Sequence, residues 1–581
     1  MRPDPAFVAY PGRRLFVLAV LSLLTLALLG RALGLVLVDG EFLLTQGDAR
    51  ALRTVAVPTH RGMILDRNGE PLAASTAVES VWVNPKELVT ARERWAELAR
   101  ALGMSAKHLE QLLSGRLNRE FVYLRRHLEP GRAEQVKDLG IAGVYLQREY
   151  RRYYPTGEVT GHVVGFTDVD DVGQEGIELA YDHWLRGTAG AKRVIRDGRG
   201  RIVEDVESIK APQPGRDLYL SIDRRLQYLA YRELKAAVKE HRARGGSVVM
   251  LDARTGEVLA MVNQPAYNPN NTADRVGARF RNRAVTDVFE PGSTVKPFTV
   301  AAGLEAGTIR PDTIIDTSPG TLKVGRLTVR DVHNCGVVDV GGVIRKSSNV
   351  GATKIALSMP AQALWRVFHG VGFGQPTGGD FPGEVFGILT DPKRWGEVHR
   401  ATLSYGYGLN VTALQLARSY LAFASDGFLP PVTVLRRDGV DRGQPVLSAP
   451  SVRHVRRMLE SVADEGGTGT KARAVGYRVG GKTGTAKKTA DGHYASNRYL
   501  ALFSGLAPVS APRLVMVATI DEPSGDAYYG GQVAAPVFGR IVGEALRILG
   551  VPPDDTGAVP QRLALHSDAL AARTPPAGGG L

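Results

Sequence analysis

Three short polar motifs constrain this 581-residue chain most, because a protein that uses them together must fold three distant segments onto one site. They are Ser293-Thr-Val-Lys296, Ser347-Ser-Asn349 and Lys482-Thr-Gly484, and their first residues lie 54 and 135 residues apart. Each motif alone is commonplace, as a helix start with a solvated lysine, a polar turn or the end of a strand. Their occurrence in this order predicts a serine nucleophile of the acyl-transfer kind.

The first motif sets a hydroxyl and an amine three residues apart. If Ser293 opens a helix, Ser293 and Lys296 share a face, and Pro297 favours that placement because proline disrupts a helix least at its start. A serine hydroxyl needs a base to take its proton, and lysine is a base only as the free amine. Burial or a nearby cation lowers the pKa of a lysine. Lys482 is the candidate for that second cation.

One apolar segment, residues 15–38, is long enough to cross a membrane, since a helix of about 20 residues spans a bilayer. Arg31 lies towards its far end, where a long basic side chain reaches the interface. We recognise no small-residue cleavage site after it, so we expect an uncleaved anchor rather than a signal peptide. The basic residues on its N-terminal side place residues 1–14 in the cytoplasm and the bulk of the chain outside.

Residues 50–210 form the next predicted domain, which shows no nucleophile–base pair. The run Asp66-Arg-Asn-Gly69 between apolar residues predicts a hairpin with an Asn-Gly turn. Val78–Val83 is rich in β-branched and aromatic residues and predicts a strand. Residues 91–113 have a helical pattern that breaks at Gly103.

A Pro- and Gly-rich linker, residues 211–217, leads into a second domain over residues 215–550. Strands are predicted around residues 247–252, 258–262, 500–503 and 514–520, and helices at 226–238, from 293 and at 413–424. Strands followed by helices and then strands predict a sheet flanked by helices. The Pro- and Gly-containing residues 551–581 predict a disordered tail.

Several residues with reactive side chains receive no catalytic role. We interpret His162, Glu175 and Glu178 as structural, a buried histidine and salt-bridged carboxylates. Cys335 is the sole cysteine, so no disulfide within the chain is possible, and it falls in a predicted loop. The sequence shows no metal-ligand spacing and no glycine-rich phosphate loop, so no metal or organic cofactor is expected.

The net charge of +14 favours an anionic neighbour. Nucleic acid is the runner-up among such partners, but no nucleic-acid module is recognisable and the arginines are spread along the chain. An arginine-rich surface without a particular partner is at least as good an interpretation. We therefore expect no nucleic-acid binding.

Further motifs accompany the three, and the list is Arg61-Gly-Met-Ile-Leu-Asp66-Arg-Asn-Gly69, Tyr154-Pro-Thr-Gly157, Gly173-Gln-Glu-Gly-Ile-Glu178 and Ser404-Tyr-Gly-Tyr-Gly408. With them the chain resembles the class B penicillin-binding proteins from the membrane segment to about residue 550. Lys482-Thr-Gly-Thr-Ala-Lys-Lys488 and Tyr528-Tyr-Gly-Gly531 resemble the septal, FtsI-type branch rather than the elongation branch. The resemblance implies an α+β architecture: a non-catalytic pedestal of the dimerisation type and a serine β-lactamase/transpeptidase domain with an antiparallel sheet and a helical lobe.

The resemblance also implies the chemistry. Ser293 attacks the D-Ala–D-Ala carbonyl of a peptidoglycan stem peptide, Lys296 is the general base, and Lys482 keeps that amine neutral by repulsion while attracting the substrate carboxylate. Ser347 relays a proton to the leaving amine, and Asn349 holds the peptide or Lys296. The remaining implied site residues are Thr483 and Thr485, which bind the carboxylate and, with Ser293, form the oxyanion hole, and Gly484, beside which the substrate backbone lies.

Other activities share parts of this pattern. A class A β-lactamase needs a deacylating glutamate, and no Glu-x-x-x-Asn arrangement lies between Asn349 and Lys482. A D,D-carboxypeptidase, in which water replaces the acceptor amine, and an elongation-type transpeptidase stay open. A glycan polymerase domain and a cytoplasmic signalling domain are not recognisable, and a non-catalytic scaffold would not need all three motifs. The family's partners are stem peptides, β-lactam antibiotics, an FtsW-type glycan polymerase and other division proteins.

Overall fold

The computed structural model describes residues 11–41, 52–196, 202–490 and 493–555. The chain divides into two compact units. The smaller unit consists of residues 1–60 and 187–214, and the larger of residues 61–186 and 215–581. Because this division differs from the predicted domain bounds of 50–210 and 215–550, those bounds stay predictions.

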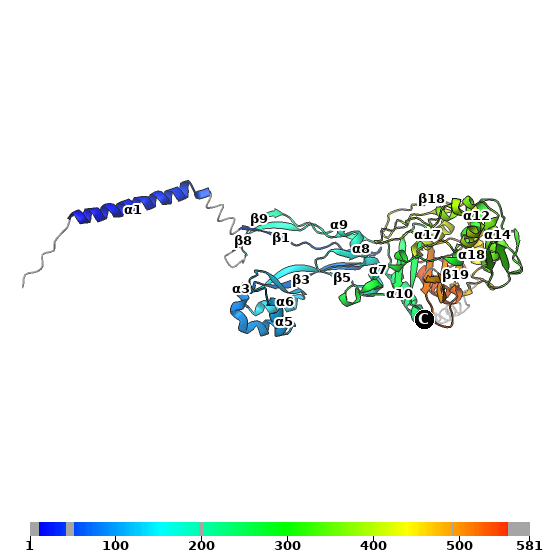
Figure 1. Ribbon diagram of the computed structural model, residues 1–581, viewed down its shortest axis with the longest axis horizontal. Coiled ribbons are helices and arrows are strands. Elements are labelled where there is room, and N and C mark those ends of the chain that lie inside the picture. Colours follow the sequence, from blue (N-terminus) through cyan, green and yellow to red (C-terminus); the bar gives the residue numbers. More distant parts are fainter. Residues whose placement is uncertain (1–10, 42–51, 197–201, 491–492, 556–581) are drawn as a thin grey trace, which may run out of the picture. The chain divides into compact units, whose positions relative to one another are not determined.

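The smaller unit contains one long apolar helix and a three-stranded antiparallel sheet (Figure 1). Helix α1 (Pro11–Leu37) has 27 residues, starts slightly earlier than predicted, and has no buried residue. It is the one described helix long and apolar enough to span a membrane. The strands are β1 (Leu52–Val57), β8 (Gly190–Arg196) and β9 (Ile202–Lys210), in the order β1-β8-β9. Residues 1–10 of the predicted cytoplasmic tail lie outside the described residues.

In the larger unit, residues 61–186 supply β2 to β5 of a sheet of order β10-β2-β3-β4, in which β5 also pairs with β3; β10 comes from later in the chain. Its strands are β2 (Ile64–Leu65), β3 (Pro71–Val83), β4 (Val122–Leu128), β5 (Val144–Tyr153) and β10 (Leu218–Tyr219). The other elements are α3 (Pro85–Leu88), η1 (Val89–Arg94), α4 (Trp95–Ala101), α5 (Ala106–Leu113), α6 (Pro130–Asp138), η2 (Gly157–Val159), α7 (Gly161–Val164), β6 (Phe166–Thr167), β7 (Gly173–Glu175), α8 (Gly176–Ala180) and α9 (Asp182–Leu185).

The local predictions for this region are confirmed. Strands β2 and β3 form the hairpin, whose turn places Gly69 at φ 87°, a value that glycine adopts without strain. Strand β3 ends at Val83, and Asn84 then caps α3 by accepting from the Lys86 N–H. The helical stretch breaks near Gly103, where φ is 69°.

The predicted structural roles fit two of three residues. Glu178 is fully buried and accepts from Arg61 Nε and Arg152 Nε, each at 2.6 Å. His162 is buried against Tyr267, and burial lowers its pKa to about 4. Glu175 was expected to be salt-bridged, and this is wrong: it forms no ion pair with any described residue, and burial raises its pKa.

A five-stranded antiparallel sheet of order β12-β11-β21-β20-β19 forms the centre of the second part. Its strands are β11 (Gly245–Asp252), β12 (Val258–Gln264), β19 (Gly480–Ala490), β20 (His493–Ala507) and β21 (Leu514–Asp521). Val248 and Met250 face one hydrophobic core, with α10 (Arg224–Glu240) and α20 (Ala535–Ile548), whereas Val249 and Leu251 face the other, with α17 (Ala413–Ala424). The predicted α+β sheet with helices on its faces is confirmed.

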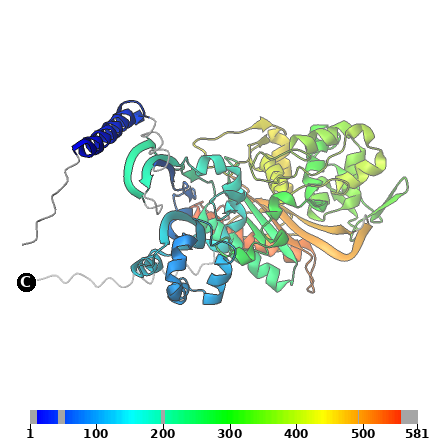
Figure 2. The ribbon, with the colours of Figure 1, turned by 60° about the vertical axis from the view of Figure 1, so that its left-hand side comes forward.

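A helical lobe lies beside the edge strand β19; Figure 2 shows the orange β19–β20 hairpin next to the green and yellow helices. Its helices are α12 (Lys296–Glu305), α13 (Val340–Arg345), α14 (Asn349–Leu357), α15 (Ala361–Gly370), α16 (Glu397–Ser404) and α18 (Ala449–Glu460). Smaller strands are β13 (Ile314–Asp316), β14 (Thr321–Val324), β15 (Leu327–Arg330), β16 (Val337–Asp339), β17 (Phe428–Leu429) and β18 (Gln444–Pro445). Short helices are η3 (Thr272–Asp274), η4 (Gly277–Arg279), α11 (Arg283–Thr286), η5 (Gly292–Val295), η6 (Pro392–Arg394), η7 (Thr470–Ala472) and α19 (Gly530–Val533).

The start of the predicted disordered tail is ordered. The Val551 carbonyl accepts from Tyr477 Oη at 2.8 Å, and Asp554 accepts from the Arg478 N–H at 2.7 Å. The prediction is therefore wrong for residues 551–555, because these contacts pin them to the domain. The rest of the predicted tail, residues 556–581, lies outside the described residues.

Candidate active site

Ser293 lies in a 3₁₀ turn, η5, directly before α12. The α-helix itself begins at Lys296 with Pro297 in its first turn, so the prediction that Ser293 opens an α-helix is displaced by one turn. Fully buried Tyr420 stabilises the turn, because its Oη donates to the Thr294 carbonyl at 2.8 Å. The Ser293 side chain is half-buried, and its hydroxyl makes no hydrogen bond to any described residue.

Lys296 is fully buried and its amine points at the second motif. Its Nζ donates to the Ser347 carbonyl, to Ser347 Oγ at 3.2 Å and to Asn349 Oδ1 at 2.7 Å. Three acceptors from the second motif therefore hold the amine close to the turn that carries Ser293. Asn349 was predicted to hold either the peptide or Lys296, and its Oδ1 contacts Lys296 in this structure.

Lys482, on β19, is also fully buried, and its Nζ donates to Ser347 Oγ at 2.8 Å. The Ser347 hydroxyl thus lies within hydrogen-bond distance of both amines, although Lys296, Ser347 and Lys482 come from three separate motifs. Ser347 has a φ of 60°, a strained value for a non-glycine residue that recurs at functional sites. The three motifs converge, as a shared site requires.

Both amines have a lowered pKa. Burial is the main reason that the pKa of Lys296 falls to about 7, and Asp331 and Cys335 act in the opposite direction. Burial also holds the pKa of Lys482 well below its ordinary value, and repulsion from Lys296 lowers it further. Of the two causes that the sequence left open for Lys296, burial or a nearby cation, burial is therefore the main one here, and the repulsion by Lys482 stays a prediction.

Asp331 holds the second motif in place, although no sequence pattern pointed to it. Its carboxylate accepts from Ser348 Oγ at 2.6 Å, from the Val350 N–H at 3.0 Å and from the Asn349 N–H. These N–H groups begin α14, so a negative charge there is stabilised by the helix terminus. Asp331 lies 16 residues before Ser347, in a loop between β15 and β16 whose position depends on tertiary structure.

The third motif lies on the edge strand β19, which leaves one side of its backbone without a partner strand. Close approach explains Gly484, because a Cβ there would stand 2.9 Å from Thr294 Cγ2. Thr485 Oγ1 accepts from the Gly530 N–H at 3.0 Å and keeps its own proton free to donate. Thr483 Oγ1 lies 2.8 Å from Thr468 Oγ1.

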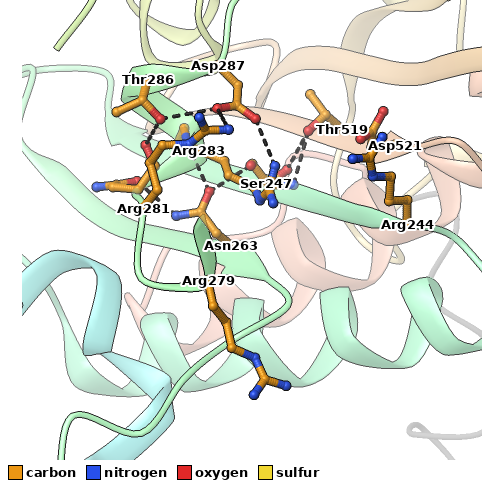
Figure 3. A network of polar contacts seen from close by, with 12 residues as sticks. Arg244, Ser247, Asn263, Arg279, Arg281, Arg283, Thr286, Asp287, Thr519 and Asp521 are labelled. Atoms are coloured by element: carbon orange, nitrogen blue, oxygen red, sulfur yellow. Dashed lines mark hydrogen bonds and ion pairs between the residues drawn. The ribbon is translucent and has the colours of Figure 1, made fainter. Parts of the chain in front are cut away.

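A polar network anchors the chain segment that leads into Ser293 (Figure 3). Asn263 on β12 accepts from Ser247 Oγ at 2.7 Å and from the Ala284 N–H at 2.9 Å, which ties α11 to the sheet. Arg283 on α11 pairs with Asp287 at 3.0 Å. A cavity of about 370 Å³ adjoins this network and extends to residues flanking Ser293 and the third motif.

Glu290 connects the Ser293 turn to two neighbouring loops. Its carboxylate accepts from the Gly408 N–H at 2.9 Å and from Tyr494 Oη at 3.1 Å, and burial raises its pKa. Gly406 lies still closer to the turn, because a Cβ there would meet the Gly292 carbonyl oxygen at 2.0 Å. The Ser404–Gly408 motif is thus explained by packing against the nucleophile turn.

Two family models match the chain. The penicillin-binding protein transpeptidase domain matches residues 246–543, and the penicillin-binding protein dimerisation domain matches residues 56–220. The first covers the sheet, the helical lobe and all three motifs.

Curated relatives match nearly the whole chain. The peptidoglycan D,D-transpeptidase FtsI of Escherichia coli is 44% identical over 539 residues, which cover 92% of this chain and 91% of the relative. The chain belongs to the class B penicillin-binding proteins of the FtsI type. A probable peptidoglycan D,D-transpeptidase PenA of Neisseria meningitidis is 43% identical over 550 residues, covering 93% of this chain and 94% of the relative.

Solved structures extend the comparison to the fold of this penicillin-binding protein. The transpeptidase domain of Burkholderia pseudomallei penicillin-binding protein 3 is 44% identical, with a TM-score of 0.54, and covers 58% of this chain and 97% of that structure. A peptidoglycan synthetase from Bifidobacterium adolescentis matches at a TM-score of 0.70 over 87% of this chain and 98% of that structure. At 24% identity, the second supports the fold alone.

Proposed function

We propose that this chain is a serine-type peptidoglycan D,D-transpeptidase that cross-links stem peptides during septal wall synthesis in cell division. The observation that supports it best is the meeting of two buried lysines at one serine hydroxyl, beneath the half-buried Ser293, in a chain of the FtsI type. β-Lactam antibiotics acylate the same serine. The predicted bounds, a pedestal over residues 50–210 and a transpeptidase domain over residues 215–550, are part of this proposal.

Acylation starts at Ser293. Lys296, as the free amine, takes the hydroxyl proton while the oxygen attacks the carbonyl of the penultimate D-Ala, and the backbone N–H groups of Ser293 and Thr485 receive the developing oxyanion. The bond to the terminal D-Ala then breaks, and the proton passes through Ser347 to the leaving amine. A pKa near 7 suits this base, since both its forms are populated at neutral pH.

The role of Lys482 is to bind the carboxylate of the substrate. A carboxylate bound by Thr483, Thr485 and the Lys482 amine raises the pKa of that amine, so that Lys482 becomes charged and repels a proton from Lys296. Substrate binding then frees the base. A depsipeptide donor whose carboxylate is methylated tests this: its acylation rate should need a higher pH, and an unchanged pH profile would contradict the coupling.

Deacylation needs an amine from a second stem peptide, which attacks the acyl-enzyme and regenerates Ser293. If water attacks instead, the outcome is a D,D-carboxypeptidase, and a lateral-wall location would make the enzyme of the elongation type. Mass spectrometry of products from paired stem peptides separates the first alternative, and imaging of a tagged chain separates the second. Products without cross-links would exclude the transpeptidase.

The anchor and partners complete the proposal. Helix α1 is apolar and has no buried residue, as a single membrane-spanning helix has none in the absence of a bilayer. We place its N-terminal end in the cytoplasm and the catalytic domain outside the cytoplasmic membrane, because of the arginines that precede the apolar run. An FtsW-type glycan polymerase is the proposed partner, with other division proteins.

The decisive experiment is covalent labelling with a fluorescent penicillin. Ser293→Ala should abolish labelling while circular dichroism stays that of the wild type, and Ser425→Ala, away from the three motifs, should label normally. Undiminished labelling of Ser293→Ala would contradict the assignment of Ser293 as the nucleophile. Cross-linking of stem peptides by that variant would contradict the proposed transpeptidase mechanism.

A further inference from the structure

A second cavity, of about 480 Å³, lies in the larger unit and shares no residue with the three motifs. It lies among β4, α6, β5, the loop after β6 and the 268–275 loop that follows β12. Basic side chains dominate its lining, and these are Arg125, Arg126, Arg132, Arg151, Arg152 and Arg275. We call this cavity the arginine pocket.

Among the described residues, only Arg126 and Arg152 of these six arginines form an ion pair. Arg275 donates to the backbone carbonyls of Thr167 and Pro269 and stacks on the Phe166 ring at 4.4 Å, without an ion pair to any described residue. Burial lowers its pKa, and Arg151 nearby lowers it further. Arg151 likewise forms no ion pair within the described part of the chain. Two guanidinium groups thus repel each other without a counter-charge.

A third arginine contributes a buried donor without an acceptor. Arg152 uses Nε on Glu178 at 2.6 Å and Nη1 on Ser75 Oγ at 3.1 Å, but Nη2 is buried and has no hydrogen-bond partner among the described residues. A buried unsatisfied donor costs free energy, more so when it is charged. Asp171 is close, but burial raises its pKa and so weakens it as a counter-charge.

Two of the other nearby acids are already engaged, whereas Glu129, which also lines the pocket, is exposed and forms no ion pair with a described residue. Glu149 accepts from Ser80, from Tyr123 at 3.0 Å and from Arg126 at 3.1 Å. Asp168 accepts from the backbone N–H groups of residues 170 and 172. The pocket therefore has an excess of donors over acceptors that its own side chains do not balance.

We propose that the arginine pocket binds a multiply charged oxyanion group, with Arg151, Arg152 and Arg275 as its donors. Guanidinium groups bind such groups through paired N–H donors, for which phosphate and carboxylate oxygens are matched acceptors. Two sources share this chemistry, a phosphoryl or pyrophosphoryl group and a cluster of carboxylates. The 268–275 loop is already joined to the end of β5, because Asn270 donates to the Tyr154 carbonyl at 2.8 Å. A ligand bound by Arg151, Arg152 and Arg275 would join the same two segments a second time.

Calorimetry and thermal unfolding of the full chain in detergent test the proposal. Sodium pyrophosphate and citrate are titrated separately at constant ionic strength, with sodium chloride as the balance. At least one should give saturable heat and a saturable rise in Tm, and the one that does identifies the phosphoryl or the carboxylate source. Absence of both responses for both anions would overturn the proposal.

Variants locate the site. Arg151→Gln removes an exposed cation that pairs with no side chain in the described part of the chain, so the fold is retained. Kd should rise about 10- to 100-fold, as expected for one charge-assisted interaction. Arg254→Gln, an exposed arginine at the β11–β12 turn, is the matched control and should bind as the wild type does. Penicillin labelling at the wild-type level shows that each variant is folded. Equal Kd values for Arg151→Gln and the wild type would refute the site.

Discussion

Asp331→Asn is the most informative perturbation, because it removes one charge and almost no volume. The carboxylate accepts two backbone N–H groups and one hydroxyl. Replacing a charge-assisted bond by a neutral one costs roughly 1 kcal/mol, so two N–H bonds lose about 2 kcal/mol. Loss of the charge at the start of α14 adds about 0.3–1 kcal/mol. If the whole loss falls on the placement of Ser347 and Asn349, acylation slows by up to about 100-fold.

The same substitution should change the pH profile in a fixed direction. Asp331 raises the pKa of Lys296 by favouring its charged form, so its removal lowers that pKa below the wild-type value of about 7. More of the free amine is then present in mild acid. The acid limb of the acylation profile should therefore move to lower pH, even though the maximal rate falls.

Stopped-flow acylation by a fluorescent penicillin between pH 5 and pH 9 measures both effects. Asp312→Asn, an exposed aspartate in the same lobe, is the control and should match the wild type in rate and profile. A lower rate with an unmoved acid limb would mean that Asp331 acts through packing alone. A wild-type rate and profile in folded Asp331→Asn would refute the reasoning.

Three further outcomes follow from the same geometry. In the wild type, acylation should weaken as the pH falls below about 7, because Lys296 is then protonated; a flat profile down to pH 5 would point to another base. Gly484→Ala should slow acylation at least tenfold with the fold retained, since its Cβ meets Thr294 Cγ2 at 2.9 Å; a wild-type rate would argue against close approach. Glu178→Gln should destabilise by about 3–5 kcal/mol in denaturant unfolding, because buried Arg152 loses its one ion pair to a described residue and buried Arg61 keeps only its pair with Asp182. Glu120→Gln, in an exposed pair, should change stability little, and equal effects would contradict the argument.

Much of the fold follows from local pattern. The Asn-Gly hairpin, the β3 strand and the strands of the central sheet carry period-two patterns or turn residues that act through neighbouring backbone. The pattern did not predict that Ser293 lies in a 3₁₀ turn, because the shift of one turn depends on contacts with Tyr420 and β19. It also did not predict that residues 551–555 are ordered, because their partners are about 40 to 80 residues earlier in the chain.

The site divides in the same way. The motif residues were predicted from their order along the chain, and the structure brings Lys296, Ser347, Asn349 and Lys482 together. The role of Asp331 could not be predicted from the sequence, because an aspartate in a loop belongs to no periodic pattern and lies at no fixed distance in sequence from the residues that it binds. The sequence left burial and a nearby cation as two possible causes of a lowered pKa at Lys296, and it could not rank them, since burial of one side chain depends on every segment packed around it.

The two lysines can be understood only as a pair. Each is buried, so the free enzyme disfavours two charges there, and each donates to the same Ser347 hydroxyl. A proton on either amine lowers the affinity of the other amine for a proton, because two positive charges held at one hydroxyl repel each other. A carboxylate near Lys482 is then the input that decides which amine is charged. Removal of either lysine would therefore change the pKa of the other as well as abolish its own role. A substitution that keeps a positive charge at position 482 but moves it would first change the pKa of Lys296.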